Sequence, residues 1–426
     1  MNKDRIFLYC DRIILTFLCL AFFCLPFSKA ALESFIWTAI FIFIAKRFLG
    51  YRAQSLWGLL PKTRLNIVLG VFTAFNALSV AYSAYLGLSL RGFFGKELKF
   101  LAIYFMINEV INTKRRLKTI LFAIIASAAL IIIDAGVMYF MKVDFLRGHK
   151  LGPETFSASF YCSTDFAAWL IVIIPVFIGI IAANIIPGIR LKILLSAAVI
   201  VQFLFLMKTY SRGGWFGFLA GILLIFYYAL KDSSLLVRRL FIILSLSLLC
   251  IGPLMPHSVA TNVKYYIWSN FYFGRVINAR LKSIPQAEYG TSSFVRINLW
   301  KEALRIARDY PLTGCGLNTY STVARRYKSF EWGGTYPHNS YLQKAAEIGF
   351  LGLAAFLLVL FSFFRLGLRY FNKSKDCLVL GFLSGILAFL VHAFFDTHFY
   401  ALQFIVLFWY MLGLTVAAIG LNWRNE

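Results

Sequence analysis

The sequence predicts an all-α polytopic membrane protein with about twelve transmembrane helices and one long, partly helical loop on the outer side. The first observation is composition: 60% of the 426 residues are hydrophobic and 14% are charged. Soluble chains are about 45–50% apolar and about 25% charged. The second observation is a series of long apolar runs. Together they exclude a soluble enzyme, a DNA-binding domain and a disordered scaffold.

The apolar runs have the length of membrane-spanning helices and no alternation of apolar and polar residues, so helices are favoured over barrel strands. The runs cover residues 13–28, 32–45, 65–87, 98–112, 117–141, 166–185, 191–207, 214–230, 240–255, 345–364, 377–395 and 400–420.

The short loops give the orientation. Loops that would share the cytoplasmic side with the N-terminus are rich in Lys and Arg, as in residues 46–64, 114–118 and 365–375, whereas the short outer connections carry far fewer. This is the positive-inside pattern. We therefore expect both termini in the cytoplasm and no cleavable signal peptide. The predicted division is 1–255 for nine transmembrane helices, 256–344 for a periplasmic loop domain and 345–426 for three more helices.

One segment departs from this charge pattern. Residues 256–337 would lie outside, yet they contain eleven Lys and Arg and only four acids. Long loops cross the membrane largely regardless of charge, so the topology stands. The basic loop indicates either attraction to lipid phosphate or a site for an anionic ligand. The 43 basic residues of the chain lie between apolar runs rather than on one face, so no nucleic-acid partner is expected.

Within the loop we predict a helix over 294–307, with Ser292 and Ser293 before it and Pro311 after it. Arg296 lies on the apolar side of that helix, so it must either snorkel to headgroups or face a wet pocket. The expected apolar stripe is Val295, Leu299, Trp300, Ala303 and Leu304.

Further candidates follow along the chain. Residues 314–316 (Gly-Cys-Gly) predict a tight turn and residues 318–328 a second short helix. The basic segments 146–152 and 208–214 would lie at outer mouths of the helices. His338 would start the tenth span, where the helix dipole disfavours a positive charge on the ring. A neutral imidazole is what a general base requires, although a lone histidine is more often an interfacial or capping residue.

Together these segments resemble the O-antigen ligase family, which also covers the related O-antigen polymerases. His338-Asn339, nine residues and Gly349-Phe-Leu-Gly352 fit the family pattern of His, a polar residue, nine residues and Gly-x-x-small. The segments 209–214 (Thr-Tyr-Ser-Arg-Gly-Gly), 296–300 (Arg-x-x-x-Trp) and 311–316 (Pro-Leu-x-Gly-x-Gly) are also similar to family motifs. The resemblance covers about residues 140–420.

The resemblance implies a glycosyltransferase of the bacterial inner membrane, with its active site on the periplasmic side. It would move a glycan from undecaprenyl diphosphate to a sugar hydroxyl of lipid A–core, with inversion and without a metal or another cofactor. The residues carried over are His338 as base, Arg212 and Arg296 as diphosphate ligands, and Arg147 and Asn339 as further substrate contacts. The implied partners are this donor, a lipid A–core or glycan acceptor, and membrane lipids.

Arginine forks can hold a diphosphate through charge-assisted bonds where other enzymes use Mg²⁺, and the chain has no Asp-x-Asp. The alternative activities are a polymerase that uses a second lipid-linked glycan as acceptor, then an oligosaccharyltransferase, and finally a lipid-linked glycan flippase. A flippase should carry more charge inside its spans and shorter outer loops. Cys162 and Cys315 would both lie outside, where a disulfide could form, but we predict that neither is required.

Overall fold

The computed structural model describes residues 3–50, 60–152, 156–185, 188–231, 292–328 and 336–423. Every regular element in these ranges is helical, and the one extended pairing among them is a single bridge between Val143 and Lys150. The all-helical prediction is therefore confirmed for the described part of the chain.

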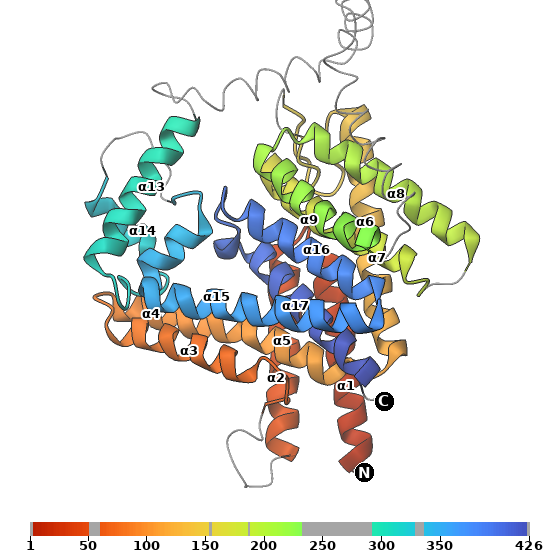
Figure 1. Cartoon of the computed structure of the whole chain (residues 1–426), viewed down its shortest axis with the longest axis horizontal. Coiled ribbons are helices and arrows are strands. Elements are labelled where there is room, and N and C mark those ends of the chain that lie inside the picture. Colours follow the sequence, from red (N-terminus) through yellow and green to blue (C-terminus); the bar gives the residue numbers. More distant parts are fainter. Residues whose placement is uncertain are drawn as a thin grey trace, which may run out of the picture.

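The first part of the chain forms a group of helices (Figure 1). The elements are α1 (Lys3–Cys24), α2 (Lys29–Gly50), α3 (Asn66–Ala81), α4 (Leu86–Gly92), the π-helical turn η2 (Phe93–Glu97), α5 (Leu98–Val110) and α6 (Lys114–Met141). In this group α2 packs on α1, and α6 on α1.

The remaining described elements are also helical. They are α7 (Ser163–Ala182), α8 (Ile189–Lys208), α9 (Arg212–Lys231), α13 (Ser292–Asp309), α14 (Tyr320–Val323), the 3-10 turn η4 (Ala324–Arg326), α15 (Ser340–Ser374), α16 (Cys377–His392), the 3-10 turn η5 (His398–Tyr400) and α17 (Leu402–Trp423). In Figure 1, α15 runs alongside α3, and α13 and α14 lie at one end of α15.

Small residues let the central helices approach closely. Helix α16 packs between α7 and α9. A Cβ atom on Gly385 of α16 would lie 2.7 Å from the Val172 carbonyl oxygen of α7, and one on Gly217 of α9 would lie 2.5 Å from that of Ala388. Close backbone approach through small residues is typical of helix pairs inside membranes.

Seven of the described helices are long and apolar enough to cross a membrane, namely α1, α6, α7, α8, α9, α15 and α17, while α3 and α16 are shorter apolar helices. The predicted run 240–255 lies outside the described residues. Each of the other eleven runs coincides with a helix. The chain is therefore a multi-pass membrane protein, and the count of about twelve spans stays a prediction.

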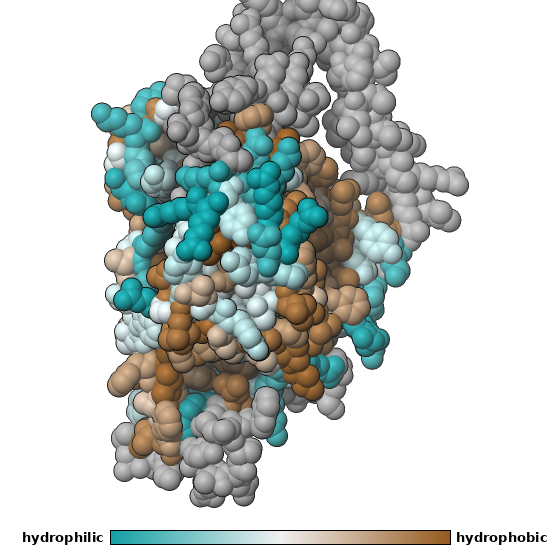
Figure 2. All heavy atoms as spheres, turned by 90° about the vertical axis from the view of Figure 1, so that its left-hand side faces the viewer, coloured by the Kyte–Doolittle hydropathy of each residue, from teal (hydrophilic) through white to brown (hydrophobic). Residues whose placement is uncertain are grey.

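Large apolar side chains cover much of the outer surface of this bundle. Ile67 is 80% exposed, Phe140 78% and Phe41 74%. Such exposure is costly in water and favourable in lipid. The end of the molecule seen in Figure 2 has hydrophilic residues gathered in its upper part and apolar residues below them.

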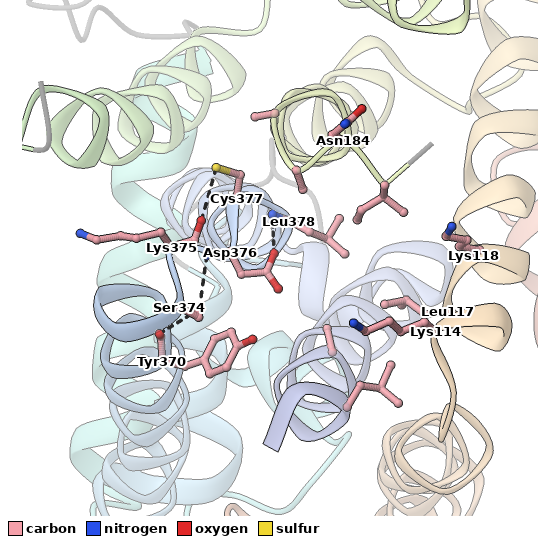
Figure 3. A pocket seen from close by; sticks show the side chains of 15 residues that line it. Lys114, Leu117, Lys118, Asn184, Tyr370, Ser374, Lys375, Asp376, Cys377 and Leu378 are labelled. Carbon is pink, nitrogen blue, oxygen red and sulfur yellow. Dashed lines mark hydrogen bonds between the residues drawn. The ribbon is translucent and has the colours of Figure 1, made fainter. Parts of the chain in front are cut away.

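The structure groups segments that the sequence places on the same side of the membrane. A cavity of about 660 Å³ is lined by the start of α6, the end of α7, the α15–α16 turn and the end of α17, with Lys114, Lys118, Asn184, Asp376 and Leu421 among its residues (Figure 3). All of these segments belong to predicted cytoplasmic connections. The grouping supports the predicted alternation of sides, whereas the side that faces the cytoplasm stays a prediction.

Candidate functional site

Helix α13 carries Arg296 and begins at Ser292, two residues before the predicted start. Leu299 and Ala303 of the predicted stripe are buried. Leu304 is 42% exposed, so its place in the stripe was wrong. The buried face continues instead through Ile306 and Ala307. The face follows the helical period of 3.6 residues more closely than the predicted stripe did.

The backbone N–H groups of the Gly-Cys-Gly turn form hydrogen bonds within the fold. The N–H groups of Cys315 and Gly316 donate to the carbonyl oxygens of Ala346 and Glu347 over 2.8 and 3.0 Å. The turn is therefore the tight turn that was predicted, and its N–H groups are not available to cradle a phosphate. The predicted short helix after it is confirmed as α14 and η4.

Those carbonyl groups are accessible because α15 is broken at Gly349, whose φ of 73° and ψ of 176° are not helical. A left-handed φ favours glycine. A Cβ atom at Gly349 would lie 2.2 Å from the Leu312 carbonyl oxygen. The sequence predicted close helix packing at Gly349 and Gly352. In the structure, glycine is required at position 349 mainly because the helix breaks there with a left-handed φ.

The residue before α15 caps the N-terminus of that helix. Asn339 is buried, and its side-chain oxygen accepts from the N–H groups of Tyr341 and Leu342, both over 3.0 Å. Asn339 is thus the N-cap, a favoured position for its residue type. Its Nδ2 is buried and has no hydrogen-bond partner among the described residues. A substrate contact by Asn339 stays a prediction.

His338 stands just outside this cap, with a left-handed φ of 47°. Its ring pairs with a carboxylate that the sequence analysis did not select: His338 Nδ1 lies 3.0 Å from Asp396 Oδ1. The His338 side chain is 38% exposed and that of Asp396 15%. Asp396 belongs to the turn between α16 and α17, and Ser340 Oγ fixes this turn by donating to the Asp396 carbonyl oxygen over 2.8 Å.

The surroundings keep Asp396 ionised. Burial alone would raise the pKa of its carboxyl group, but the hydrogen bond from His338 and favourable electrostatic interactions with His398, His338 and His392 outweigh burial and hold this pKa well below its usual range. With an ionised Asp396 on Nδ1, the proton of the neutral ring sits on that nitrogen, and Nε2 keeps its lone pair. His338 can therefore accept a proton at Nε2.

Arg212 and Arg296 meet in one cavity of about 110 Å³, which we call the arginine cavity. It is lined by Ser163, Thr164, Thr209, Tyr210, Ser211, Arg212, Gly213, Arg296, His392, Phe395 and Asp396. Arg212 is the first residue of α9, and Arg296 comes from α13. Two guanidinium groups at the N-terminus of a helix favour an anion. Asp396 links this cavity to His338.

The Ser-Arg-Gly-Gly segment explains how Arg212 reaches the cavity. Ser211 caps α9, since its Oγ accepts from the Gly214 N–H over 3.2 Å. A Cβ atom on Gly213 would lie 2.8 Å from the His392 ring. The small residue therefore lets the start of α9 lie directly against the end of α16.

Two more histidines that sequence reasoning set aside extend the network. His398 Nε2 lies 3.1 Å from His392 Nδ1, and His392 Nε2 lies 3.5 Å from Ser211 Oγ. Burial lowers the pKa of His398. The pair thus forms a buried neutral relay of hydrogen bonds behind the arginine cavity. In the sequence, the only indication that these residues act together is that His392 and His398 flank a short turn containing Asp396.

Arg147 lies apart from this site. It is in the turn between α6 and α7, where its Nη1 donates to the Ser159 carbonyl oxygen over 3.2 Å, and it does not line the arginine cavity. Cys162 and Cys315 are both free thiols. Burial raises the pKa of Cys162 to about 11 and that of Cys315 to about 12, so neither is a reactive thiolate.

The arrangement can bind an anion and accept a proton beside it. Across the ranges that the structure describes, no three His, Cys, Asp or Glu side chains are grouped to hold a metal ion. Whether the chemistry is independent of metal stays a prediction, which transfer in the presence of a chelator would test.

Residues 197–357 match the family model described as O-antigen ligase. Over this segment the chain is similar to the O-antigen ligase family. A comparison with curated proteins gives no match. The matched segment includes Arg212, Arg296, His338 and Asn339, whereas Arg147 precedes it. Asp396 follows it and joins the site only through the fold, by its hydrogen bond to His338.

Proposed function

We propose that this protein transfers a glycan from undecaprenyl diphosphate to a sugar hydroxyl of lipid A–core, on the periplasmic side of the bacterial inner membrane. The observation that carries the proposal is the arginine cavity: two arginines from separate helices of the matched segment share it with Asp396, whose carboxylate orients His338.

The donor diphosphate is held by Arg212 and Arg296. Their planar forks can bind phosphate oxygens in pairs and stabilise the negative charge that grows on the leaving group. The N-terminus of α9 adds a favourable dipole at Arg212. In this proposal, the arginines do the work that a divalent metal does in other transferases.

His338 activates the acceptor. Its Nε2 takes the proton of the sugar hydroxyl while that oxygen attacks C1 of the donor sugar. The new bond is C1–O, and the bond from C1 to the diphosphate oxygen breaks with its electron pair staying on the diphosphate. A single attack opposite the leaving group inverts the anomeric configuration. Asp396 stabilises the imidazolium that forms.

The test is complementation of a host that lacks its ligase. Expression of this chain should restore a ladder of glycan-capped lipopolysaccharide with the chain lengths that the host's own polymerase makes. Longer lipid-linked glycans without capping of lipid A–core would indicate the polymerase instead. Movement of donor across the membrane without any new glycosidic bond would indicate the flippase.

A further inference from the structure

A second cavity shares the α16–α17 turn with the arginine cavity. Its volume is about 380 Å³, and its polar lining includes Glu97, Lys99, Asn318, Lys344, Glu347 and Tyr400; we call it the lysine–glutamate cavity. Asp396 and Phe395 of the turn face the first cavity, and Phe399 and Tyr400 face the second. The start of α15 connects them, since His338 precedes that helix and Lys344 lies about one turn into it.

Several charges around this cavity are already matched within the fold. Lys99 Nζ donates to Glu33 Oε1 over 2.7 Å. The carboxylate of Glu347 accepts from the N–H groups of Asn318 and Tyr320 over 3.0 and 3.2 Å. These groups join α5 to α2 and the residues at the start of α14 to α15, so their presence is explained by structure.

Glu97 and Lys344 attract each other electrostatically, and Lys344 also attracts Glu347, but none of these attractions is a direct ion-pair contact among the described residues. Glu97 is 8% exposed, and its Oε1 is buried without a hydrogen-bond partner among the described residues. Lys344 is 7% exposed; its Nζ lies 4.7 Å from the centre of the Phe356 ring, and no ion pair joins it to Glu97 or Glu347 in the described structure. Buried charged groups that lack a direct hydrogen-bonded or ion-paired partner are costly. In membrane proteins such residues mark functional sites.

The lining indicates the class of ligand. The arginine cavity has two guanidinium groups suited to an anion. The lysine–glutamate cavity instead offers a carboxylate acceptor, an ammonium donor and the aromatic side chains of Phe100, Phe399 and Tyr400. Sugar hydroxyls both donate and accept hydrogen bonds, so a polyol ring can satisfy both Glu97 and Lys344 at once. A few converging polar groups in a partly apolar cavity are typical of small-molecule sites.

We propose that the lysine–glutamate cavity binds a saccharide unit of the acceptor, with Glu97 accepting from its hydroxyl groups and Lys344 donating to them. This inference rests on the proposed function, because it assigns the second substrate of the same reaction. A saccharide held here lies beside the α16–α17 turn and the start of α15. Its next sugar can then extend toward His338 and the donor.

Binding to the purified full-length protein tests the site without requiring turnover. The two probes are delipidated core oligosaccharide and undecaprenyl diphosphate. Glu97→Gln keeps the side-chain shape and removes the charge, so the Kd for the oligosaccharide should rise about tenfold, the usual effect of losing a hydrogen bond to a charged group. The Kd for undecaprenyl diphosphate should stay within about twofold. Arg296→Lys should show the opposite pattern.

Two more variants complete the experiment. Arg91→Gln changes an exposed side chain at the same cavity, so it should weaken oligosaccharide binding even if Glu97→Gln is poorly folded. Lys301→Gln removes an exposed charge on α13 outside the cavity and should bind both probes as wild type does.

The outcomes separate the two proposals. Unchanged oligosaccharide binding in both Glu97→Gln and Arg91→Gln, or no oligosaccharide binding by the wild type, would overturn the saccharide site. A wild-type protein that binds both probes as expected but transfers no glycan would contradict the proposed function and leave the saccharide site standing.

Discussion

The pair formed by His338 and Asp396 is the centre of the site at the scale of single residues. The carboxylate lies 3.0 Å from Nδ1 of the imidazole, so Nε2 is the nitrogen that can accept a proton. Asp396 itself is fixed by its neighbours, since Thr397 N–H donates to the same Oδ1 over 2.8 Å. The base is thus oriented by a turn that also lines the arginine cavity.

Replacing Asp396 by asparagine tests this orientation. The neutral amide of Asp396→Asn cannot stabilise an imidazolium as a carboxylate does, so transfer should fall about 10²-fold or more, with undecaprenyl diphosphate binding retained. Initial rates of the reconstituted protein measure the effect. The exposed Asp309, which accepts from the Tyr327 hydroxyl group, supplies the matched Asp309→Asn control. Equal rates for Asp396→Asn and wild type would separate Asp396 from the chemistry.

The effect of Asp396→Asn on the stability of the protein should depend on pH. Because the pKa of Asp396 is lowered on folding, ionised Asp396 stabilises the fold above its unfolded pKa of about 3.9, and that contribution is lost as pH falls through the folded value. The melting temperature of Asp396→Asn should therefore lie below wild type at pH 7, and the difference should shrink below about pH 4. A difference that does not change with pH would argue against the charge.

The arginines should not tolerate lysine. Lysine keeps the positive charge and loses the fork that binds two phosphate oxygens. Losing one charge-assisted contact costs about 1.5–3 kcal/mol, so Arg212→Lys and Arg296→Lys should each transfer at least about tenfold more slowly than the wild type. Arg305→Lys, at an exposed position of α13, is the control. Wild-type rates in both site variants would favour simple attraction to lipid headgroups.

The sequence predicts the site residues that lie in recognisable motifs, but it does not predict Asp396, which lies in none. Arg212, Arg296 and His338 stand in recognisable segments, and the fold places the two arginines in one cavity with the partner of His338. Asp396 stands alone in a short turn far along the chain, so its pairing with His338 depends on tertiary contacts. Arg147 had a similar basic loop around it, but its guanidinium binds the Ser159 carbonyl group.

At the scale of elements, the break in α15 determines the shape of the site. Asn339 caps the first part of the helix, which carries Lys344 and Glu347, and the break at Gly349 lets Cys315 and Gly316 hydrogen-bond to its carbonyl groups. The length of the apolar run predicted a helix over residues 345–364. It could not predict the break, because a single glycine in an apolar run is also typical of close helix packing.

Replacing Gly349 by Ala should destabilise the protein. An alanine at a φ of 73° is strained, and its Cβ atom would meet the Leu312 carbonyl oxygen. We expect a loss of about 2 kcal/mol or more, measured as a lower unfolding temperature in detergent. Gly136 of α6 has open space around its Cβ position, so Gly136→Ala should be neutral or stabilising. Equal stability of the two variants would contradict the role of the break.

At the scale of the whole molecule, the described connections fall into two groups. The arginine and lysine–glutamate cavities gather the predicted outer connections, and the 660 Å³ cavity gathers predicted cytoplasmic ones. Apolar run lengths and loop charges predicted this alternation because both reflect the bilayer directly. The way in which the outer turns converge into cavities was not predictable, since it depends on how the helices pack.

The topology predicts the side on which each group lies. Reporter fusions at residue 426 should read as cytoplasmic, and fusions within residues 256–337 should read as periplasmic, because the short cytoplasmic loops carry the positive charge. A periplasmic reading at residue 426 would contradict the predicted orientation. It would place His338 on the cytoplasmic side, away from the proposed donor.

The most direct test of the central claim is glycan transfer by the purified protein, from undecaprenyl-diphosphate glycan to rough lipopolysaccharide, with and without His338. The account predicts transfer by the wild type and a loss of about 10²–10⁴-fold in His338→Ala, while the variant still inserts in membranes and binds undecaprenyl diphosphate. Transfer by His338→Ala at a rate near that of the wild type would contradict the account, and His338 would then be a structural residue.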